Sequence, residues 1–187
     1  MRKKFLVAAG IVAVIAIGTY TLAESTDKNE SGKLNTVAVN MDTASFKQMV
    51  QSFSMRTAQA ESASISSTQL IVKESDTKST TYSLPKDEFF VSIAPYVEKT
   101  HPCATHSLTG CQGEMVGEDF NISVKDSDGH MVMDNQTVQS QPNGFIDLWL
   151  PRDRTFQVTI EHDGKKAESE ISTFETNDTC VTTMQLG

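Results

Sequence analysis

Cysteine and basic residues are both scarce in this sequence, and each shortage restricts what the chain can do. The three cysteines are an odd number, so at least one thiol per chain lacks an intramolecular partner. Lysine and arginine number 16 against 24 aspartates and glutamates, which gives a formal net charge of −8. This acidic balance argues against a nucleic-acid partner, which needs a basic patch. The glycine signatures of phosphate-binding loops and the Gly-x-Ser-x-Gly motif of a serine nucleophile are also missing.

Residues 1–23 are predicted to be a signal peptide. Basic residues 2–4 precede an apolar run from Phe5 to Ile17, and Thr21-Leu22-Ala23 offers small residues where a signal peptidase cleaves. The protein is therefore expected in the periplasm or on the extracellular face of the cell envelope. The alternative is an uncleaved anchor, since the run can just span a bilayer, and this segment would be the only contact with the membrane. An exported chain meets conditions that favour disulfides, so its unpaired thiol is expected to have a function.

Composition divides the rest of the chain into three parts. Residues 24–41 are polar, with few large apolar side chains, which is typical of a flexible linker. Residues 42–84 are predicted to hold a helix and a β-hairpin, and residues 85–187 to form a β-rich domain. The predicted fold class is α+β, with a small N-terminal helix-plus-hairpin region followed by an antiparallel β-sandwich-like domain.

The N-terminal region is predicted from two local patterns. Behind an N-cap of Asp42 or Thr43, apolar side chains recur at helical spacing: Phe46, Met49, Val50 and Phe53. The hairpin is expected from β-prone residues 67–73 and 80–84 around a turn, whereas residues 57–64 hold no strong element. A helix and a hairpin bury little surface alone, so this region needs a partner, either the second domain or another copy of itself.

Short strands separated by turn signals about every ten residues predict the β-sandwich. Apolar and polar residues alternate through residues 119–124 and 155–160, and Asp-Gly pairs at 128–129 and 163–164 mark tight turns. Residues 88–93 are predicted to be a strand that leads into the loop described next. The single tryptophan, Trp149, is expected in the core.

The residues with the most distinctive chemistry lie between His101 and Met115, a stretch that we call the metal loop. It contains Cys103 and Cys111, and two of the four histidines, His101 and His106. Thiolate and imidazole are preferred ligands of soft and borderline metals, whereas a disulfide needs no imidazole beside it. The residues alone leave both a metal site and a Cys103–Cys111 disulfide open, and the histidines favour the metal.

Cys180, from the far end of the chain, would complete three sulfur donors. Three thiolates suit Cu(I), which accepts trigonal sulfur ligation. With His106 as a fourth donor, the same residues would make a tetrahedral zinc site.

Other candidate residues are weaker. His101 is expected at the rim of the loop rather than on the metal, and Glu114 is expected either to orient His106 or to neutralise a strand edge. Residues 130–133, His-Met-Val-Met, offer a second copper site, but ordinary strand methionines explain them better. Residues 126–129 lack the full set of oxygen ligands of a calcium loop and are predicted to form a turn.

The metal loop also carries a family resemblance. The segment Cys103-Ala-Thr-His-Ser-Leu-Thr-Gly-Cys-Gln-Gly-Glu-Met115, preceded by Phe89-Phe-Val-Ser-Ile-Ala-Pro-Tyr96 and followed by a lone Cys180, resembles the CueP family of extracytoplasmic copper-binding proteins. The resemblance implies that the three cysteines bind metal, that the metal is copper, and that the N-terminal part is a dimerisation region. It also implies that the thiols can reduce Cu(II) and that Cu,Zn superoxide dismutase is among the recipients.

The expected function is therefore that of an exported metallochaperone for copper tolerance and delivery. Cu(I) would be held by Cys103, Cys111, Cys180 and His106, zinc could replace it, and the chain would form a homodimer. Reduction of Cu(II) at a binding site would not make the protein a conventional enzyme. The alternatives are a thiol–disulfide oxidoreductase, which normally has two residues between its cysteines, and a structural cell-surface module with a Cys103–Cys111 disulfide.

Overall fold

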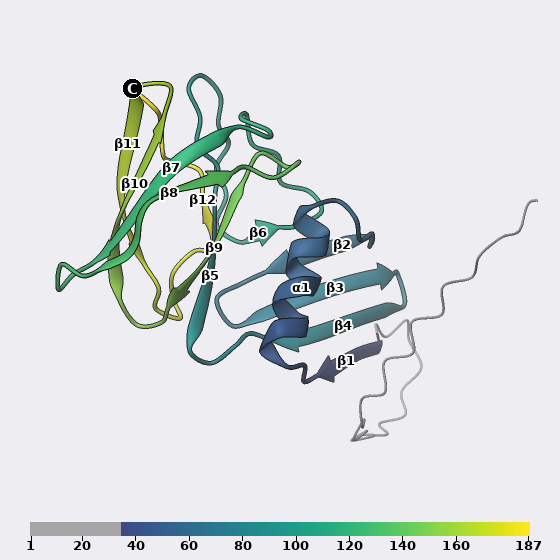
Figure 1. Ribbon diagram of the computed structural model, residues 1–187. Helices are drawn as coiled ribbons and strands as arrows, with labels where there is room; N and C mark the ends of the chain where they lie inside the picture. Colours follow the sequence, from purple (N-terminus) through teal and green to yellow (C-terminus); the bar gives the residue numbers. More distant parts are fainter. Residues whose placement is uncertain (1–34) are drawn as a thin grey trace, which may run out of the picture. The chain divides into compact units, whose positions relative to one another are not determined.

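The computed structural model describes residues 35–187, so the predicted signal peptide and most of the predicted linker lie outside the described residues. In this part of the chain the fold is mostly β, with one short helix, as expected (Figure 1). The elements follow one another as β1 (Asn35–Val39), α1 (Thr43–Ser54), β2 (Ser62–Ile65), β3 (Gln69–Ser75), β4 (Lys78–Ser83), β5 (Glu88–Ile93), β6 (His106–Ser107), β7 (Asp119–Asp126), β8 (Met131–Gln139), β9 (Ile146–Pro151), β10 (Thr155–His162), β11 (Lys165–Ser172) and β12 (Cys180–Val181).

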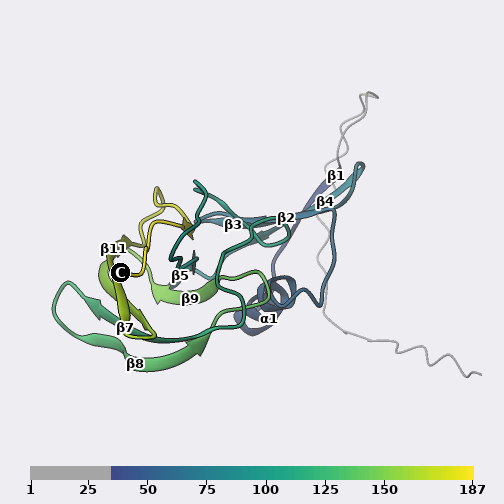
Figure 2. The ribbon, with the colours of Figure 1, turned by 90° about the horizontal axis from the view of Figure 1, so that it is seen from above.

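Helix α1 covers one face of a sheet with the strand order β1-β4-β3-β2-β6 (Figure 2). It begins where expected, because the Asp42 carboxylate accepts a hydrogen bond from the Ser45 N–H at 3.0 Å. The predicted stripe faces the sheet, and Phe46 and Val50 are each only 1% exposed. The stripe is therefore covered by its own chain, which removes the reason for expecting it to seek a second copy.

Two strands of this sheet differ from the sequence-based prediction. Residues 35–39, expected in the linker, form β1 and pair in parallel with β4. Residues 62–65, where no strong element was expected, form β2. The Ser-Ala-Ser-Ile sequence of β2 has little β propensity, but Ala63 and Ile65 alternate inward and are fully buried. Tertiary packing, rather than local preference, makes this strand.

The β-rich half is a sandwich, as predicted. One sheet has the order β11-β10-β7-β8 and the other β12-β5-β9, and β12 pairs with β5 in parallel while the other pairs are antiparallel. Alternate apolar residues of the two sheets form one core, which includes Phe89, Val91 and Ile93 of β5 and Phe120, Ile122 and Val124 of β7. The predicted alternation in residues 119–124 and 155–160 thus marks the buried faces.

Strand β5 is buried on both faces, and this places the metal loop. Its odd-numbered residues face the sandwich core, whereas Phe90 joins the apolar cluster under α1 and Ala94 joins the cluster around the cysteines. The described residues, 35–187, pack as one compact unit. The predicted regions 42–84 and 85–187 therefore share a hydrophobic cluster and a sheet, and their division into domains stays a prediction.

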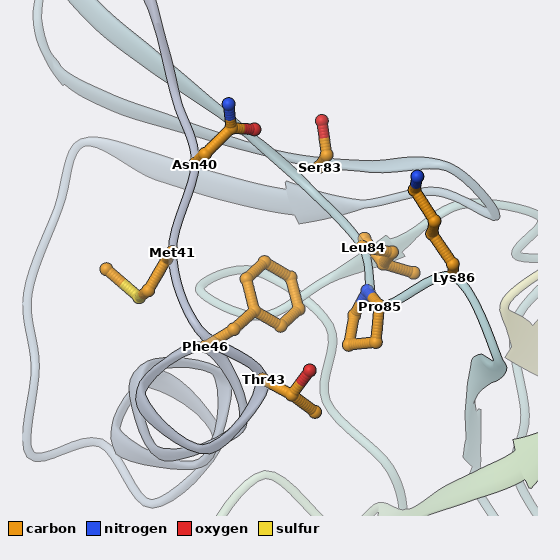
Figure 3. Close-up of a pocket in the computed structure, with 8 residues that line it drawn as sticks. All are labelled: Asn40, Met41, Thr43, Phe46, Ser83, Leu84, Pro85 and Lys86. Carbon is orange, nitrogen blue, oxygen red and sulfur yellow. The ribbon is translucent and has the colours of Figure 1, made fainter. Parts of the chain in front are cut away.

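Away from the metal loop, a pocket of about 220 Å³ lies between the chain that enters α1 and the chain that leaves β4 (Figure 3). The Phe46 ring, Met41, Leu84 and Pro85 supply most of its wall. It shares no residue with the metal loop. The described chain offers no helix with both the length and the apolar character needed to cross a bilayer.

Candidate metal centre

The metal loop is anchored by the short strand β6. His106 pairs with Ile65 of β2, and the Leu108 N–H donates to the Ala63 carbonyl at 2.8 Å. A tight turn follows, in which the Cys111 N–H donates to the Ser107 carbonyl at 2.9 Å. The turn brings Cys111 back beside Cys103, and their sulfurs lie 3.5 Å apart without a disulfide.

Cys180 reaches the loop through β12. This strand lies parallel to β5, with the Ser92 N–H donating to Thr179 and the Ala94 N–H donating to Val181, both at 2.8 Å. The Cys180 N–H then donates to the Ala104 carbonyl of the metal loop at 3.1 Å. The last strand thus brings Cys180 under the loop, in the place that the sequence predicted.

Among residues 35–187, the sulfur and imidazole ligand atoms of the metal loop and Cys180 form two sets that share one member. His106, Cys111 and Cys180 make one set, whose ligand atoms all lie within 4.8 Å of one another, and His106 Nδ1 is 3.6 Å from Cys180 Sγ. A ring nitrogen of His101 makes the other set with Cys103 and Cys111, within the same limit. Cys111 belongs to both sets, and in the described chain no set holds all three sulfurs. His101, expected at the rim, is thus brought to the sulfurs.

The imidazole of His106 is held in a dry, largely apolar setting. It is fully buried, Cys180 is 4% exposed, and the His106 ring centroid lies 4.6 Å from that of Phe145 and 6.1 Å from that of Phe90. Its Nε2 has no hydrogen-bond partner within the described residues. Within the described residues the imidazole thus meets only the sulfurs of Cys180 and Cys111, and soft sulfur and imidazole donors fit a copper or zinc ion.

The pKa values of the three thiols are shifted in different directions. A hydrogen bond from the Cys180 thiol is the largest cause that lowers the pKa of Cys111, and His106 and the Ser107 N–H lower it further against the effect of burial. The same contact, together with burial, raises the pKa of Cys180, and burial raises the pKa of Cys103. The hydrogen bond between Cys180 and Cys111 thus favours the thiolate form at Cys111, the sulfur common to both sets, over Cys180.

Two groups that hold the loop in place were missed by the sequence-based prediction. Arg56, just after α1, donates to the carbonyls of Leu108, Thr109 and Cys111 at 3.2, 2.7 and 3.1 Å. Nothing in a single basic residue after a helix indicates such contacts.

The second contact that holds the loop in place is a close approach of the backbone of Gly113 to that of Gly144. A Cβ atom on Gly113 would lie 2.3 Å from the Gly144 carbonyl oxygen, so only glycine fits. Gly144 adopts φ +76°, and its neighbour Phe145 packs against the ring of His106. The Asn143-Gly144 turn was visible in the sequence, but not its contact with the loop.

Glu114 has neither of the roles expected of it. Its carboxylate accepts hydrogen bonds from the N–H groups of Val97, Glu98 and Lys99, the last at 2.8 Å, and it makes no contact with His106. These bonds lower the pKa of Glu114, and the Lys99 N–H contributes most. Glu114 therefore fixes the chain that leaves β5.

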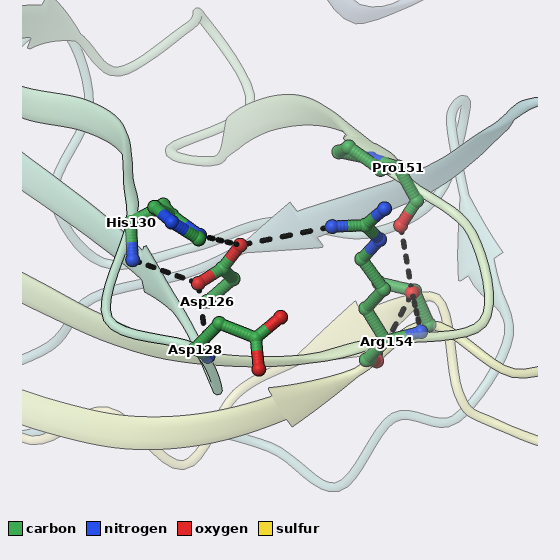
Figure 4. A network of polar contacts seen from close by, with 6 residues as sticks. Asp126, Asp128, His130, Pro151 and Arg154 are labelled. Atoms are coloured by element: carbon green, nitrogen blue, oxygen red, sulfur yellow. Dashed lines mark hydrogen bonds and ion pairs between the residues drawn. The ribbon is translucent and has the colours of Figure 1, made fainter.

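The other candidates lie away from the loop. Asp126 accepts hydrogen bonds from the N–H groups of Asp128 and His130 and lies 3.6 Å from an Arg154 nitrogen, so its carboxylate closes the predicted turn (Figure 4). Met131 of the His-Met-Val-Met segment is exposed on β8, at the edge of its sheet. His162 packs against Phe120, and its Nδ1 lies 2.9 Å from the Asp119 carbonyl oxygen.

Comparison with known proteins places this arrangement in context. The family model "Periplasmic copper-binding protein CueP" matches residues 46–185, which run from α1 past β12 and include all three cysteines. A solved structure named "Crystal Structure of S.CueP" is similar, with 38% sequence identity and a TM-score of 0.71, and the match covers 76% of this chain and 89% of that chain. No curated protein matches the chain.

Proposed function

Because the chain belongs to the CueP family of periplasmic copper-binding proteins, we propose that it binds one Cu(I) ion through Cys103, Cys111, Cys180 and His106. Membership of the family confirms the resemblance of the metal loop and the predicted export to the periplasm. Beyond membership of the family, we propose the oxidation state of the metal, its ligands and its destination.

The observation that carries the proposal is the meeting of a buried imidazole with three free thiols. The His106 and Cys180 side chains come from strands that lie far apart in the sequence, and Cys180 Sγ is the hydrogen-bond partner of His106 Nδ1 among the described residues. Soft sulfur donors favour Cu(I) over the harder Cu(II). Zinc accepts the same donors, so we expect it to replace copper when copper is absent.

The site is also built for reduction of Cu(II). When the Cys103 and Cys111 thiolates join in a disulfide, they release two electrons, which convert two Cu(II) ions to Cu(I). Their sulfurs are in contact at 3.5 Å, so little movement is needed. The same closeness supports the rival function of a thiol–disulfide oxidoreductase, which would form the disulfide without copper.

Delivery follows from the unequal burial of the donors. Cys103 is partly exposed, so an acceptor protein can reach one sulfur while the others still hold the ion. We propose that the protein supports copper tolerance in this way and passes copper to recipients such as Cu,Zn superoxide dismutase. We also propose that it works as a homodimer.

The binding proposal is tested by titrating reduced protein with a chromogenic Cu(I) chelator as competitor. We expect one Cu(I) per chain and a loss of affinity for each single Cys→Ser variant and for His106→Ala. If Cys180→Ser bound Cu(I) as tightly as wild type, Cys180 of β12 would not be a ligand.

Reduction is tested by mixing reduced protein with Cu(II), following Cu(I) with the same chelator and mapping disulfides by mass spectrometry. A triple Cys→Ser variant that yields Cu(I) equally fast would contradict it. A disulfide formed without any Cu(I) would favour the oxidoreductase or the structural module instead.

A further inference from the structure

The two donor sets in the metal loop differ in exposure. His101 and Cys103 are partly exposed, whereas His106 is fully buried and Cys180 is 4% exposed. The sets therefore mark an outer position near solvent and an inner position in the protein interior. Their single common member, Cys111, lies between them.

We propose that copper occupies these two positions in succession. It first binds at the outer position, formed by His101, Cys103 and Cys111, and then moves to the inner position, formed by Cys111, His106 and Cys180. The proposal rests on the proposed copper binding and adds a role for His101, which becomes a ligand during loading and release rather than at rest.

The shared sulfur makes the transfer a simple exchange of ligands. The bond from copper to the His101 nitrogen breaks, and bonds to His106 Nδ1 and Cys180 sulfur form, while the bonds to Cys103 and Cys111 persist, which gives the four ligands of the proposed function. Cys180 gives up its thiol proton to solvent as it binds. Copper stays Cu(I) throughout, and one proton passes from the protein to solvent.

Phe145 keeps the two positions distinct. Its ring packs against both imidazoles, with centroid distances of 6.3 Å to His101 and 4.6 Å to His106. An aromatic ring in contact with both histidines hinders them from closing on one ion together. The two histidines are thus assigned to different positions, although only four residues separate them in the sequence.

The proposal predicts that the effect of His101→Ala on Cu(I) affinity depends on whether Cys180 is present. In wild type, copper rests at the inner position, so His101→Ala should change the equilibrium Cu(I) affinity by less than about threefold. In Cys180→Ser only the outer position keeps its full set of donors, so adding His101→Ala should lower the affinity by about tenfold or more. Competition with a chromogenic Cu(I) chelator under anaerobic, reducing conditions measures all four proteins.

His162→Gln is the matched control, because His162 belongs to none of the candidate donor sets among the described residues and its ring packs against Phe120. It should leave the affinity unchanged in both backgrounds. His106→Ala should weaken binding in the wild-type background, which is the opposite pattern to His101→Ala.

A kinetic measurement tests the same proposal without Cys180→Ser, should that variant fail to fold. Transfer of Cu(I) from the chelator complex to apoprotein should be slowed about tenfold by His101→Ala, with the same end point. An equal rate in wild type and His101→Ala, or an equal effect of His101→Ala in both backgrounds, would overturn the proposal. Wild-type protein that takes up no Cu(I) would instead contradict the proposed function itself.

Discussion

Arg56 links the end of α1 to the metal loop, although it lies about 50 residues away from it in the sequence. Its guanidinium donates to three loop carbonyls, and its backbone adopts φ +58°, which is unusual for a residue other than glycine. The planar fork of an arginine can satisfy several carbonyls at once, which a lysine cannot. Arg56 therefore fixes the backbone on which Cys111 sits without touching the sulfur.

We predict that Arg56→Ala weakens Cu(I) binding by roughly tenfold or more, since the loss of groups that orient metal ligands has effects of this size. Arg56→Lys should restore only part of the affinity. The measurement is competition with a Cu(I) chelator, and circular dichroism confirms that each variant is folded. Wild-type affinity in a folded Arg56→Ala variant would show that the loop holds its shape alone.

Glu114 gives a prediction for pH. Its folded-state pKa is lowered by the N–H groups of residues 97–99, so its stabilising effect is present above the unfolded pKa, about 4.3, and is lost as the pH falls through the folded value. Glu114→Gln should therefore lower the free energy of unfolding at pH 7, by less than about 1 kcal/mol because solvent screens this exposed carboxylate, and have little effect near pH 3. Urea unfolding at both pH values measures this.

The control for Glu114 is Glu175→Gln, which alters an exposed carboxylate outside the metal loop. It should have a small effect at either pH. A loss of stability in Glu114→Gln that is as large at pH 3 as at pH 7 would show that the carboxylate charge is not the cause.

At the scale of elements, α1 is tied to the sandwich by a buried polar link. Asp147 of β9 accepts hydrogen bonds from Ser54 of α1 and Ser92 of β5, each at 2.6 Å. Ser54 and Ser92 are fully buried, so neither hydroxyl can exchange its partner for water. The link therefore fixes where the helix lies against β5 and β9.

We predict that Ser54→Ala lowers the free energy of unfolding by about 1–3 kcal/mol, because it removes one of the two hydroxyl donors of the partly buried Asp147 carboxylate. Ser52→Ala is the matched control on the same helix. The Ser52 hydroxyl donates to the Met49 carbonyl within the helix, so its loss should cost less than about 0.5 kcal/mol. Chemical denaturation of both variants measures the difference, and equal losses would contradict the role given to Asp147.

The strands differ in how far the sequence could predict them. Strands β5, β7 and β10 were predicted because apolar residues mark their buried faces, and turn residues mark their ends. Strand β1 was not predicted because its parallel partner, β4, follows α1 in the sequence. Strand β2 was not predicted because its small residues show no clear alternation of strongly apolar and polar side chains. Local sequence does not predict a strand whose conformation depends on a partner strand far away in the sequence.

The same limit applies to the metal centre. Residue chemistry made Cys103, Cys111, Cys180 and His106 candidates, because few side chains bind soft metals, and the resemblance to the CueP family favoured a metal site over a disulfide. It could not find Arg56 or the second role of His101, since both depend on which segments meet in space. The Arg56 contact with Cys111, for example, joins residues 55 positions apart.

For the whole molecule, we predict that protein purified from the periplasm begins at Glu24 and is a dimer. Intact mass spectrometry determines the first residue, and light scattering determines the molecular mass. Because the α1 stripe is buried within the chain, a dimer must use other surfaces, so Met49→Ala should leave its mass unchanged. A monomer at micromolar concentration would contradict the predicted homodimer, and a mass that includes residues 1–23 would indicate an uncleaved anchor.

The separation of Cys180 from the loop has a consequence for the timing of metal uptake. His106 and Cys180 are 74 residues apart, and they meet only when β12 pairs with β5. During synthesis and export the loop emerges well before its last sulfur, and an unfolded chain cannot assemble the inner position. It follows that a chain exported before it folds would cross the membrane without copper at the inner position, and would bind copper there only after β12 has paired with β5.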